Sequence, residues 1–278
     1  MKIVAKQLKD VPETLLFTLY MRYRESQRPD GKLSDKRYAA LIDAIDYDFS
    51  VFADIPDGMQ LSIVCRTIIF DHVTKQHIEK HPEATIVSLG SGLDFRVDRV
   101  DNGKILWVDI DVPEVIEIRK HLFQETKRLR FIPASVLDFA WMDHIPKYGP
   151  VLFIAEGLLV YFTPHEVKTI LIQIANHFPP SEMVLDVISN LYLNMVKTGT
   201  PYAFLHKMFA LWKWGLDDWS ELEAMDPRIR FIEEFYQRDG FGERMPEDLK
   251  DALSDSSYSE YIQEEIQKFS RIVHITLG

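Results

Sequence analysis

Two glycines follow a short apolar segment, residues 86–89, that is predicted as a buried strand. Gly90 and Gly92 lack a Cβ atom, so their backbone can approach a ligand closely. N–H groups near the start of the following helix can receive an anionic or polar group. A dinucleotide-binding pattern would place a third glycine at residue 95, but this chain has Phe95 followed by Arg96. The turn therefore predicts a nucleotide-like ligand and makes NAD the weaker candidate.

Three acidic residues at or near the ends of predicted strands are candidates for binding such a ligand. Asp109 and Asp111 lie about 20 residues beyond Gly90, where an acidic side chain can accept hydrogen bonds from both ribose hydroxyls. Glu156 ends a later predicted strand within an apolar run, and an unpaired charge is expensive to bury there. Glu156 is therefore predicted to face a ligand's cationic end, or to orient a neighbouring base or amide.

The composition limits the class of protein. The 278 residues are 46% hydrophobic and 27% charged, which is ordinary for a globular protein with a full core. The formal charge of −11 argues against nucleic acid as a partner, because that binding relies on Lys and Arg. Cys65 is the only cysteine, which excludes an intramolecular disulfide and a thiolate cluster for zinc. No metal site is expected. With no visible secretory signal and no apolar run of about 20 residues, we expect a soluble cytoplasmic protein that has no membrane contact.

The elements that must position these residues alternate along the chain. Residues 10–84 are predicted to be helical, with Asp57 capping a long amphipathic helix that ends before Pro82. Strands separated by helices then imply right-handed crossovers and a mainly parallel sheet. The predicted strands are Thr85–Leu89, Lys104–Asp109, Arg130–Pro133, Val151–Ala155 and Met183–Ile188, and the predicted helices between them are Pro113–Lys127 and Pro164–His177.

The C-terminal third follows a different pattern. Residues 190–226 are rich in aromatic side chains on predicted helices, and two more strands are predicted at Arg230–Tyr236 and Arg271–Leu277. Helical segments are predicted between them at Met245–Ala252 and Tyr258–Phe269. Five core strands and two late ones predict a seven-stranded sheet with an antiparallel edge.

Five segments, in order along the chain, resemble signatures of the leucine carboxyl methyltransferase family. Val87–Arg99, Val108–Ile116 and Ala155–Phe162 resemble three of its motifs. Tyr20–Gly31 and Arg66–Asp71 resemble its bacterial branch, which includes polyketide O-methyltransferases of the tetracenomycin type. Five matches in sequence are a specific signal, and they leave the C-terminal third largely unmatched.

The resemblance implies a Rossmann-like α/β fold of class I S-adenosylmethionine-dependent methyltransferases. That fold has a seven-stranded, mainly parallel sheet whose last strand is antiparallel, in agreement with the strand count. The cofactor would be S-adenosylmethionine, with S-adenosylhomocysteine as product. We expect one methyltransferase domain over residues 1–278, made of an N-terminal helical segment (10–84), a cofactor-binding core (85–188), a helical lid or substrate region (190–226) and C-terminal strands and helices (227–278).

The resemblance also assigns cofactor-binding roles. Gly90 and Gly92 would lie against the methionine part of the cofactor. Asp111 matches the family's cofactor-binding acid, because Pro113 follows it closely, and Asp109 is the second candidate.

Further positions of the family's pattern fall on cationic and polar residues. Arg66 would bind the cofactor's carboxylate, a task that suits a bidentate guanidinium. Arg24 would assist, although Arg22 competes for that assignment and either could form a structural ion pair. Adenine would be bound at Ser135 and Val136, where Ser135 replaces the usual acid; Asp138 is an alternative acid that is better suited to capping a local turn. Glu156 would stabilise the ligand's cationic end.

The acceptor region is predicted from aromatic and cationic side chains. Tyr161 is a candidate pocket wall, and residues 190–226 are a candidate lid. The candidate substrate-binding residues are Tyr161, Tyr192, Tyr202, His206 and Trp212, with Lys197 and Lys207 as further partners for a carboxylate. A carboxylate acceptor needs no general base, so no catalytic residue is named, whereas a phenol would need one such as His206 or His165.

The sequence thus predicts an S-adenosylmethionine-dependent O-methyltransferase that methylates a carboxylate of a small molecule, polyketide-like or another secondary metabolite. A protein C-terminal carboxyl methyltransferase and a non-catalytic cofactor-binding protein are the alternatives. A dehydrogenase is disfavoured by Phe95 and by the presence of Arg66, Asp111 and Glu156. The oligomeric state is not predicted.

Overall fold

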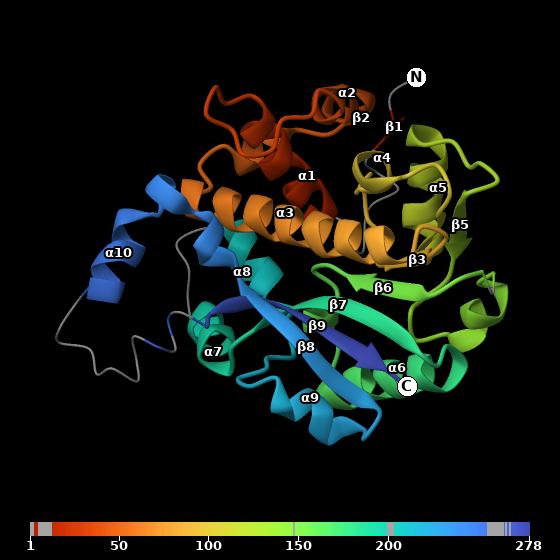
Figure 1. Cartoon of the computed structure of the whole chain (residues 1–278). Coiled ribbons are helices and arrows are strands. Elements are labelled where there is room, and N and C mark those ends of the chain that lie inside the picture. The colour runs from red at the N-terminus through yellow and green to blue at the C-terminus, as the bar shows by residue number, and fades with distance from the viewer. Residues whose placement is uncertain are drawn as a thin grey trace. The chain divides into compact units, whose positions relative to one another are not determined.

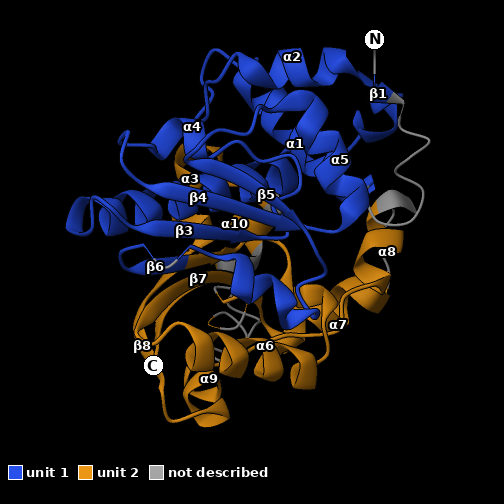
Figure 2. Cartoon of the chain, turned by 90° about the vertical axis from the view of Figure 1, so that its right-hand side faces the viewer, with its two compact units in different colours: residues 1–152 blue, residues 153–278 orange. Residues whose placement is uncertain are grey.

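The computed structural model describes residues 3–4, 13–146, 148–198, 203–254, 264, 266 and 268–278. These residues fall into two compact units, Met1–Leu152 (unit 1) and Phe153–Gly278 (unit 2), which Figure 2 colours separately. The predicted single domain over residues 1–278 stays a prediction.

A seven-stranded sheet contains all the strands that the sequence pattern predicts. Its strand order is β5-β4-β3-β6-β7-β9-β8; Figure 2 labels β4, and Figure 1 labels the other strands. They are β3 (Thr85–Leu89), β4 (Leu106–Asp111), β5 (Leu129–Pro133), β6 (Val151–Ala155), β7 (Ser181–Ile188), β8 (Ile229–Tyr236) and β9 (Ser270–Leu277). β4 is parallel to both β3 and β5, whereas β9 is antiparallel to both β7 and β8. The α/β class and the antiparallel last strand are confirmed.

The register of the first strands brings their carboxyl ends together. Leu89 pairs with Ile110, and Asp111 pairs with Pro133. All five residues of β3 are buried, as expected for a parallel strand covered on both faces. The segments that follow β3, β4 and β5 therefore leave the sheet of unit 1 at one edge, where α/β proteins bind their ligands.

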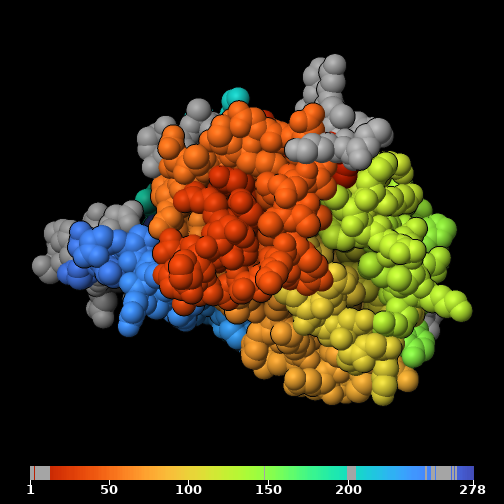
Figure 3. Space-filling model, turned by 90° about the horizontal axis from the view of Figure 1, so that it is seen from above, coloured from red at the N-terminus to blue at the C-terminus, as the bar shows by residue number. Residues whose placement is uncertain are grey.

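The helices of unit 1 include those that cover most of the predicted N-terminal helical segment, residues 10–84. They are α1 (Glu13–Ser26), α2 (Arg37–Ala44), α3 (Asp57–Lys80), α4 (Val97–Val100) and α5 (Pro113–Leu122), with short 3-10 helices η2 (Phe49–Phe52) and η3 (Phe139–His144). Figure 3 shows the red and orange N-terminal helices next to the yellow segment that contains α4. Two short strands, β1 (Ile3–Val4) and β2 (Ile45–Asp46), pair in parallel and were not predicted.

The predicted capping role of Asp57 is wrong. Asp57 is the first residue of α3, and the N-cap is Pro56, whose side chain makes no capping hydrogen bond. The Asp57 carboxylate lies in the first turn instead, where a negative charge interacts favourably with the helix dipole. The predicted end of this helix before Pro82 is confirmed, since α3 ends at Lys80.

The helix that follows β4 is shorter than predicted. α5 ends at Leu122 rather than Lys127. Thr126 explains this end, because its N–H donates to the carbonyl of Leu129 and its Oγ1 accepts from the N–H groups of Arg128 and Leu129. These hydrogen bonds form a turn that leads into β5 and competes with further helix.

Unit 2 contains the predicted helices of the C-terminal half. They are α6 (Pro164–His177), α7 (Asn190–Thr198), α8 (Ala203–Ala210), α9 (Ser220–Met225) and α10 (Glu247–Ser254), with 3-10 helices η4 (Leu159–Tyr161), η5 (Gln237–Gly240) and η6 (Gly242–Arg244). A capping box between Thr163 and Glu166 begins α6 at the predicted residue. α7, α8 and α9 confirm helices within residues 190–226. The predicted helix Tyr258–Phe269 lies mostly outside the described residues.

Candidate functional site

The glycine turn after β3 is held to the end of β4. Gly90 and Gly92 have φ angles of 62° and 51°, in the left-handed region that glycine adopts without a Cβ clash. The N–H groups of Gly90 and Ser91 donate to the carbonyl of Ile110 over 2.8 and 3.2 Å. This turn therefore presents backbone atoms at the edge of the sheet where β4 ends.

Asp111, the last residue of β4, is bonded to the glycine turn. Its Oδ2 accepts from the N–H of Gly92 at 2.7 Å, and its Oδ1 accepts from the N–H of Val112 at 2.8 Å. Burial raises the pKa of the Asp111 carboxyl, and these two donors partly offset that rise. A carboxylate has about four lone-pair sites, so two remain for the hydroxyls of a ribose. The donor set fits the predicted cofactor.

Asp109, earlier in β4, has protein partners for both oxygens. Trp107 Nε1 donates to its Oδ1 at 2.8 Å, and Arg119 Nη2 forms a buried ion pair with its Oδ2. Its role as a cofactor ligand stays a prediction, and Asp111 is the better placed of the two carboxylates.

Arg119 in α5 is a site residue that the sequence analysis missed. Its Nη1 donates to the carbonyls of Gly92 and Asp94, both at 2.8 Å. One guanidinium thus joins the glycine turn to Asp109, and the side chain is 1% exposed. A signal was present, because Arg119 shares the apolar face of the predicted helix with Val115.

The arginines expected at the cofactor's carboxylate lie on α1 and α3. Arg66 is half-buried on α3. Arg22 is 5% exposed, and its Nε donates over 2.8 Å to the hydroxyl of Thr67, the neighbour of Arg66. Arg24 instead donates over 3.0 Å to the carbonyl of Ile55, before the start of α3. Of the two candidates that the sequence left open, Arg22 contacts the helical turn of Arg66; the roles of all three stay predictions.

The loop after β5 meets Asp111 through its backbone. The N–H of Ala134 donates to the carbonyl of Asp111 at 2.8 Å, which brings Ser135 and Val136 to this edge of the sheet. Ser135 is exposed, and its Oγ accepts a backbone N–H of the same loop at 3.3 Å. Asp138 caps η3 with its carboxylate, the role that the sequence favoured for it. Adenine binding by Ser135 and Val136 stays a prediction.

In unit 2, a turn after β6 contains the predicted acid Glu156. Glu156 is half-buried, and the N–H of Gly157 donates to Asp186 Oδ1 in β7 at 2.6 Å. η4 follows, and the carbonyl of Val160 within it accepts from the N–H of Lys213 at 2.7 Å. Unit 2 therefore places Glu156 on the segment to which residues 211–216 are attached.

Two of the predicted acceptor-binding residues share an aromatic cluster of unit 2. The Tyr192 ring is stacked on Phe269 with centroids 4.9 Å apart, and it lies 6.5 Å from Trp212. Burial raises the pKa of the Tyr192 phenol to about 12. His206 is exposed on α8, and Tyr202 lies outside the described residues. Other polar candidates are also exposed: Lys197, Lys207 and His165. The pocket roles of all these residues, and that of half-buried Tyr161, stay predictions.

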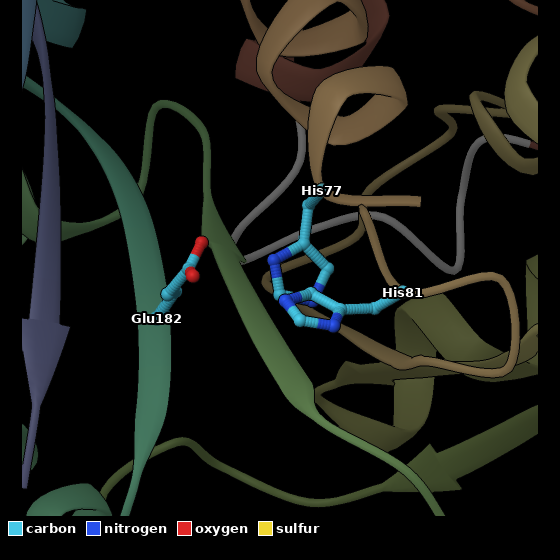
Figure 4. Close-up of side chains that lie close together, drawn as sticks. All are labelled: His77, His81 and Glu182. Carbon is cyan, nitrogen blue, oxygen red and sulfur yellow. The ribbon is translucent and has the colours of Figure 1, made fainter. Parts of the chain in front are cut away.

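A further group of titratable side chains lies at the C-terminal end of α3. Figure 4 shows His77 and His81 there, with ring centroids 4.9 Å apart. Glu182, also labelled in Figure 4, belongs to β7 of unit 2, where its Oε2 lies 2.9 Å from His274 Nε2. These side chains are not among the residues predicted to bind the cofactor.

Comparison with known proteins identifies the family. The family model of leucine carboxyl methyltransferase matches residues 17–175. This chain belongs to the leucine carboxyl methyltransferase family. It is 32% identical over 234 residues to the tetracenomycin polyketide synthesis O-methyltransferase TcmP of Streptomyces glaucescens, covering 84% of this chain and 85% of TcmP. It is 30% identical over 252 residues to the S-adenosyl-L-methionine-dependent methyltransferase dpfgK of Gibberella zeae, covering 82% of this chain and 83% of that protein.

Solved structures agree with the fold of this family member. A crystal structure from Thermobifida fusca, described as a methyltransferase candidate, has a TM-score of 0.56 at 16% identity, covering 97% of this chain and 99% of that one. A DUF574 family protein from Streptomyces avermitilis has a TM-score of 0.55 at 12% identity, covering 94% and 97% of the two chains. Membership of the leucine carboxyl methyltransferase family confirms the expected methyltransferase activity and S-adenosylmethionine as its cofactor. Among the described residues, no helix has the length and apolarity needed to cross a membrane.

Proposed function

We propose that this family member transfers the methyl group of S-adenosylmethionine to an oxygen of a small molecule, and that the accepting group is a carboxylate. The Asp111–Gly92 hydrogen bond of 2.7 Å is the observation that supports the cofactor site most directly. It holds a buried carboxylate against the glycine turn while leaving lone pairs for a ribose. The relative TcmP, an O-methyltransferase of polyketide synthesis by name, supports an oxygen of a small molecule as the acceptor.

Each part of the cofactor has candidate binding residues in this chain. The backbone at Gly90 and Gly92 would contact its methionine part, and Arg66 with Arg22 or Arg24 would bind its carboxylate. Asp111 would accept from the ribose hydroxyls, while the loop at Ser135 and Val136 would bind adenine. The family resemblance assigns the cationic end of the ligand to Glu156. The assigned residues are Arg66, either Arg22 or Arg24, Gly90, Gly92, Asp111 with Asp109 as the second candidate, Ser135, Val136 and Glu156.

The chemistry requires alignment rather than acid–base catalysis. When bound, S-adenosylmethionine supplies a methyl group on a positively charged sulfur. The acceptor's carboxylate oxygen forms a bond to that carbon as the S–C bond breaks, and the electron pair of the broken bond stays on sulfur. The products are a methyl ester and S-adenosylhomocysteine. A carboxylate is ionised at neutral pH, so the protein needs no base and acts by orienting the reactants and excluding water.

The acceptor would be bound by the aromatic cluster of unit 2. Tyr192 and Trp212 offer apolar ring faces together with a phenol and an indole N–H, which suit a flat acid. The Lys213–Val160 hydrogen bond attaches this segment to η4, which contains Tyr161. These contacts support a pocket formed by the lid segment and η4.

Two measurements test the proposal. Calorimetry compares S-adenosylmethionine with NAD, and tight binding of NAD alone would overturn the cofactor site. Mass spectrometry then follows the gain of one CH₂ group across a library of small carboxylic acids, phenols and peptides with free C-termini. We expect methyl esters of small acids. Methylation confined to peptide C-termini or to phenols would overturn the proposed acceptor.

A further inference from the structure

Four charged side chains of unit 1 form a closed ring of ion pairs beside the glycine turn. Asp71 Oδ1 accepts from Arg96 Nε, and Asp71 Oδ2 accepts from Arg99 Nε, both at 2.6 Å. Asp94 closes the ring, since its Oδ2 lies 2.8 Å from Arg96 Nη1 and its Oδ1 lies 3.4 Å from Arg99 Nη2. The four side chains are only 1% to 13% exposed. We call Asp71, Asp94, Arg96 and Arg99 the four-charge ring.

The four-charge ring connects two parts of the proposed cofactor site. Asp71 lies on α3, the helix that also contains Arg66. Asp94 follows Gly92 closely, and its N–H donates to the carbonyl of Ser91 at 3.1 Å. The ring therefore joins α3, which contains Arg66, to the glycine turn, which is proposed to contact the methionine part of the cofactor.

The charges within the four-charge ring balance one another. The ring contains two guanidinium and two carboxylate groups, so its formal charges cancel, and every buried charge has two opposite partners. Burial lowers the pKa of Arg99, but Asp94 and the hydrogen bond to Asp71 outweigh that effect and leave the pKa raised. Removing one carboxylate would leave a buried positive charge without its second partner, which is strongly unfavourable.

The ring also explains two residues that set this turn apart from a dinucleotide motif. Arg96 belongs to the ring, and the Arg99 guanidinium lies over the Phe95 ring at 5.3 Å from its centroid. Phe95 is also packed against Tyr38, with centroids 4.6 Å apart. The positions after Gly92 are therefore used to anchor the turn to neighbouring helices rather than to approach a ligand.

We propose that Asp71 is a positioning residue for the cofactor: through Arg96 and Arg99 it fixes the glycine turn relative to Arg66. The inference rests on the proposed cofactor site. Asp71 itself touches no reacting atom, so it sets the affinity for S-adenosylmethionine and not the rate of methyl transfer at saturation.

The variant Asp71→Asn tests this role in the whole 278-residue chain. We expect the Kd of S-adenosylhomocysteine by calorimetry, and the KM of S-adenosylmethionine, to rise about tenfold, because misplaced binding groups lose affinity steeply. The kcat at saturating cofactor should change by less than about twofold.

Two further variants separate positioning from general stability. The double variant Asp71→Asn/Arg99→Gln restores charge balance, so its melting temperature should recover while its Kd for S-adenosylhomocysteine stays raised. If Asp71→Asn does not fold, the Kd of this double variant tests the positioning role instead. Val73→Ala, a buried apolar position on the same helix, should lower the melting temperature without changing the Kd.

The outcomes distinguish this inference from the proposed function. A wild-type Kd for Asp71→Asn, a Kd restored in the neutral double variant, or an equal rise in Val73→Ala would overturn the positioning role. If Arg66→Ala and Asp111→Ala also bind S-adenosylhomocysteine normally, the proposed cofactor site itself fails. If those two variants bind weakly while Asp71→Asn binds normally, only the positioning role fails.

Discussion

The N–H of Gly92 donates to the carboxylate of Asp111 over 2.7 Å. This bond couples the left-handed backbone of the glycine turn to the side chain that is proposed to bind ribose. The conformation of each partner depends on the other, because the carboxylate holds the backbone of the turn and the turn orients the carboxylate. Changes at either residue should therefore alter cofactor affinity by different physical routes.

Asp111→Ala should weaken S-adenosylhomocysteine binding about 10- to 100-fold, since hydrogen bonds to a charged group contribute about 1.5–3 kcal/mol. Calorimetry measures the effect. Asp101→Ala is the matched control, because Asp101 is an aspartate of the same unit that pairs with Arg128 and should leave the Kd unchanged. Equal affinities for both variants would contradict the assignment.

Gly92→Ala should cost about 1–2 kcal/mol of stability, because its φ of 51° is strained for an L-residue. The nearest atom to the added Cβ is Leu15 Cβ at 3.7 Å, so strain and not a clash dominates. Gly103→Ala is the control: its φ is 80°, and apart from its chain neighbours no atom of the described residues lies within 4 Å of the added Cβ. Denaturant unfolding should show similar losses in both, whereas only Gly92→Ala should bind the cofactor weakly. A similar Kd in both variants would argue against ligand contact at the turn.

Cofactor affinity should fall in mild acid because burial raises the pKa of Asp111 above its ordinary value of about 4. Ribose hydroxyls bond to the ionised form, so affinity is full above the raised pKa and decreases as the pH falls through it. For the free protein the sign is opposite. There, a raised folded-state pKa contributes stability below the unfolded pKa, and this is lost as the pH rises through the folded pKa.

Calorimetry over a pH series, starting near neutrality and descending, measures this dependence. The variant Asp111→Asn has no titrating group at this position. Its affinity for the cofactor should be weaker than that of the wild type and should not decrease further as the pH falls. An identical pH profile in the variant would assign the titration to another group.

Arg119→Gln should destabilise unit 1 by about 3–5 kcal/mol, because it leaves Asp109 as a buried charge without its cation. Urea unfolding measures the loss. Arg119→Gln/Asp109→Asn removes both charges and should recover part of it. No recovery in the double variant would show that Arg119 acts mainly through the carbonyls of Gly92 and Asp94.

Glu156→Gln should weaken binding of S-adenosylhomocysteine by about tenfold, as expected for loss of one charge-assisted contact with the ligand's ammonium group. Glu223→Gln, elsewhere in unit 2, is the control, since Glu223 Oε1 accepts from the N–H of Phe231 and has no proposed ligand role. Unchanged affinity in Glu156→Gln would remove Glu156 from the site.

The sequence predicted the sheet well because each strand is a short apolar segment between clear turn signals. β3 and β6 have the predicted bounds, and β4 is displaced by two residues at each end, from Lys104–Asp109 to Leu106–Asp111. Periodicity could not place the end of α5, which depends on the side chain of one threonine, Thr126. The predicted cap of α3 was wrong because the helix begins one residue earlier than expected, so that Pro56 is the N-cap and Asp57 is the first helical residue.

Site residues that act through long-range pairs were harder to predict. Arg119 and Asp71 are ordinary helix residues in the sequence, and only the fold brings them to Asp109 and Arg96. Phe95 and Arg96 stood out because they broke a motif, but their packing against Tyr38 and Asp71 was beyond pattern analysis. Sequence motifs thus predict contacts between residues that are close in sequence, whereas ion pairs between different helices and strands become visible only in the structure.

The position of β9 has a consequence for synthesis on the ribosome. β9 pairs with β7 on one side and β8 on the other, although it is the last of these strands to be translated. Until it emerges, the nascent chain exposes the strand edges that β9 later covers, and such edges can pair with other chains. We therefore expect unit 2 to finish folding late, and to depend on protection from aggregation while its last strand is still being made.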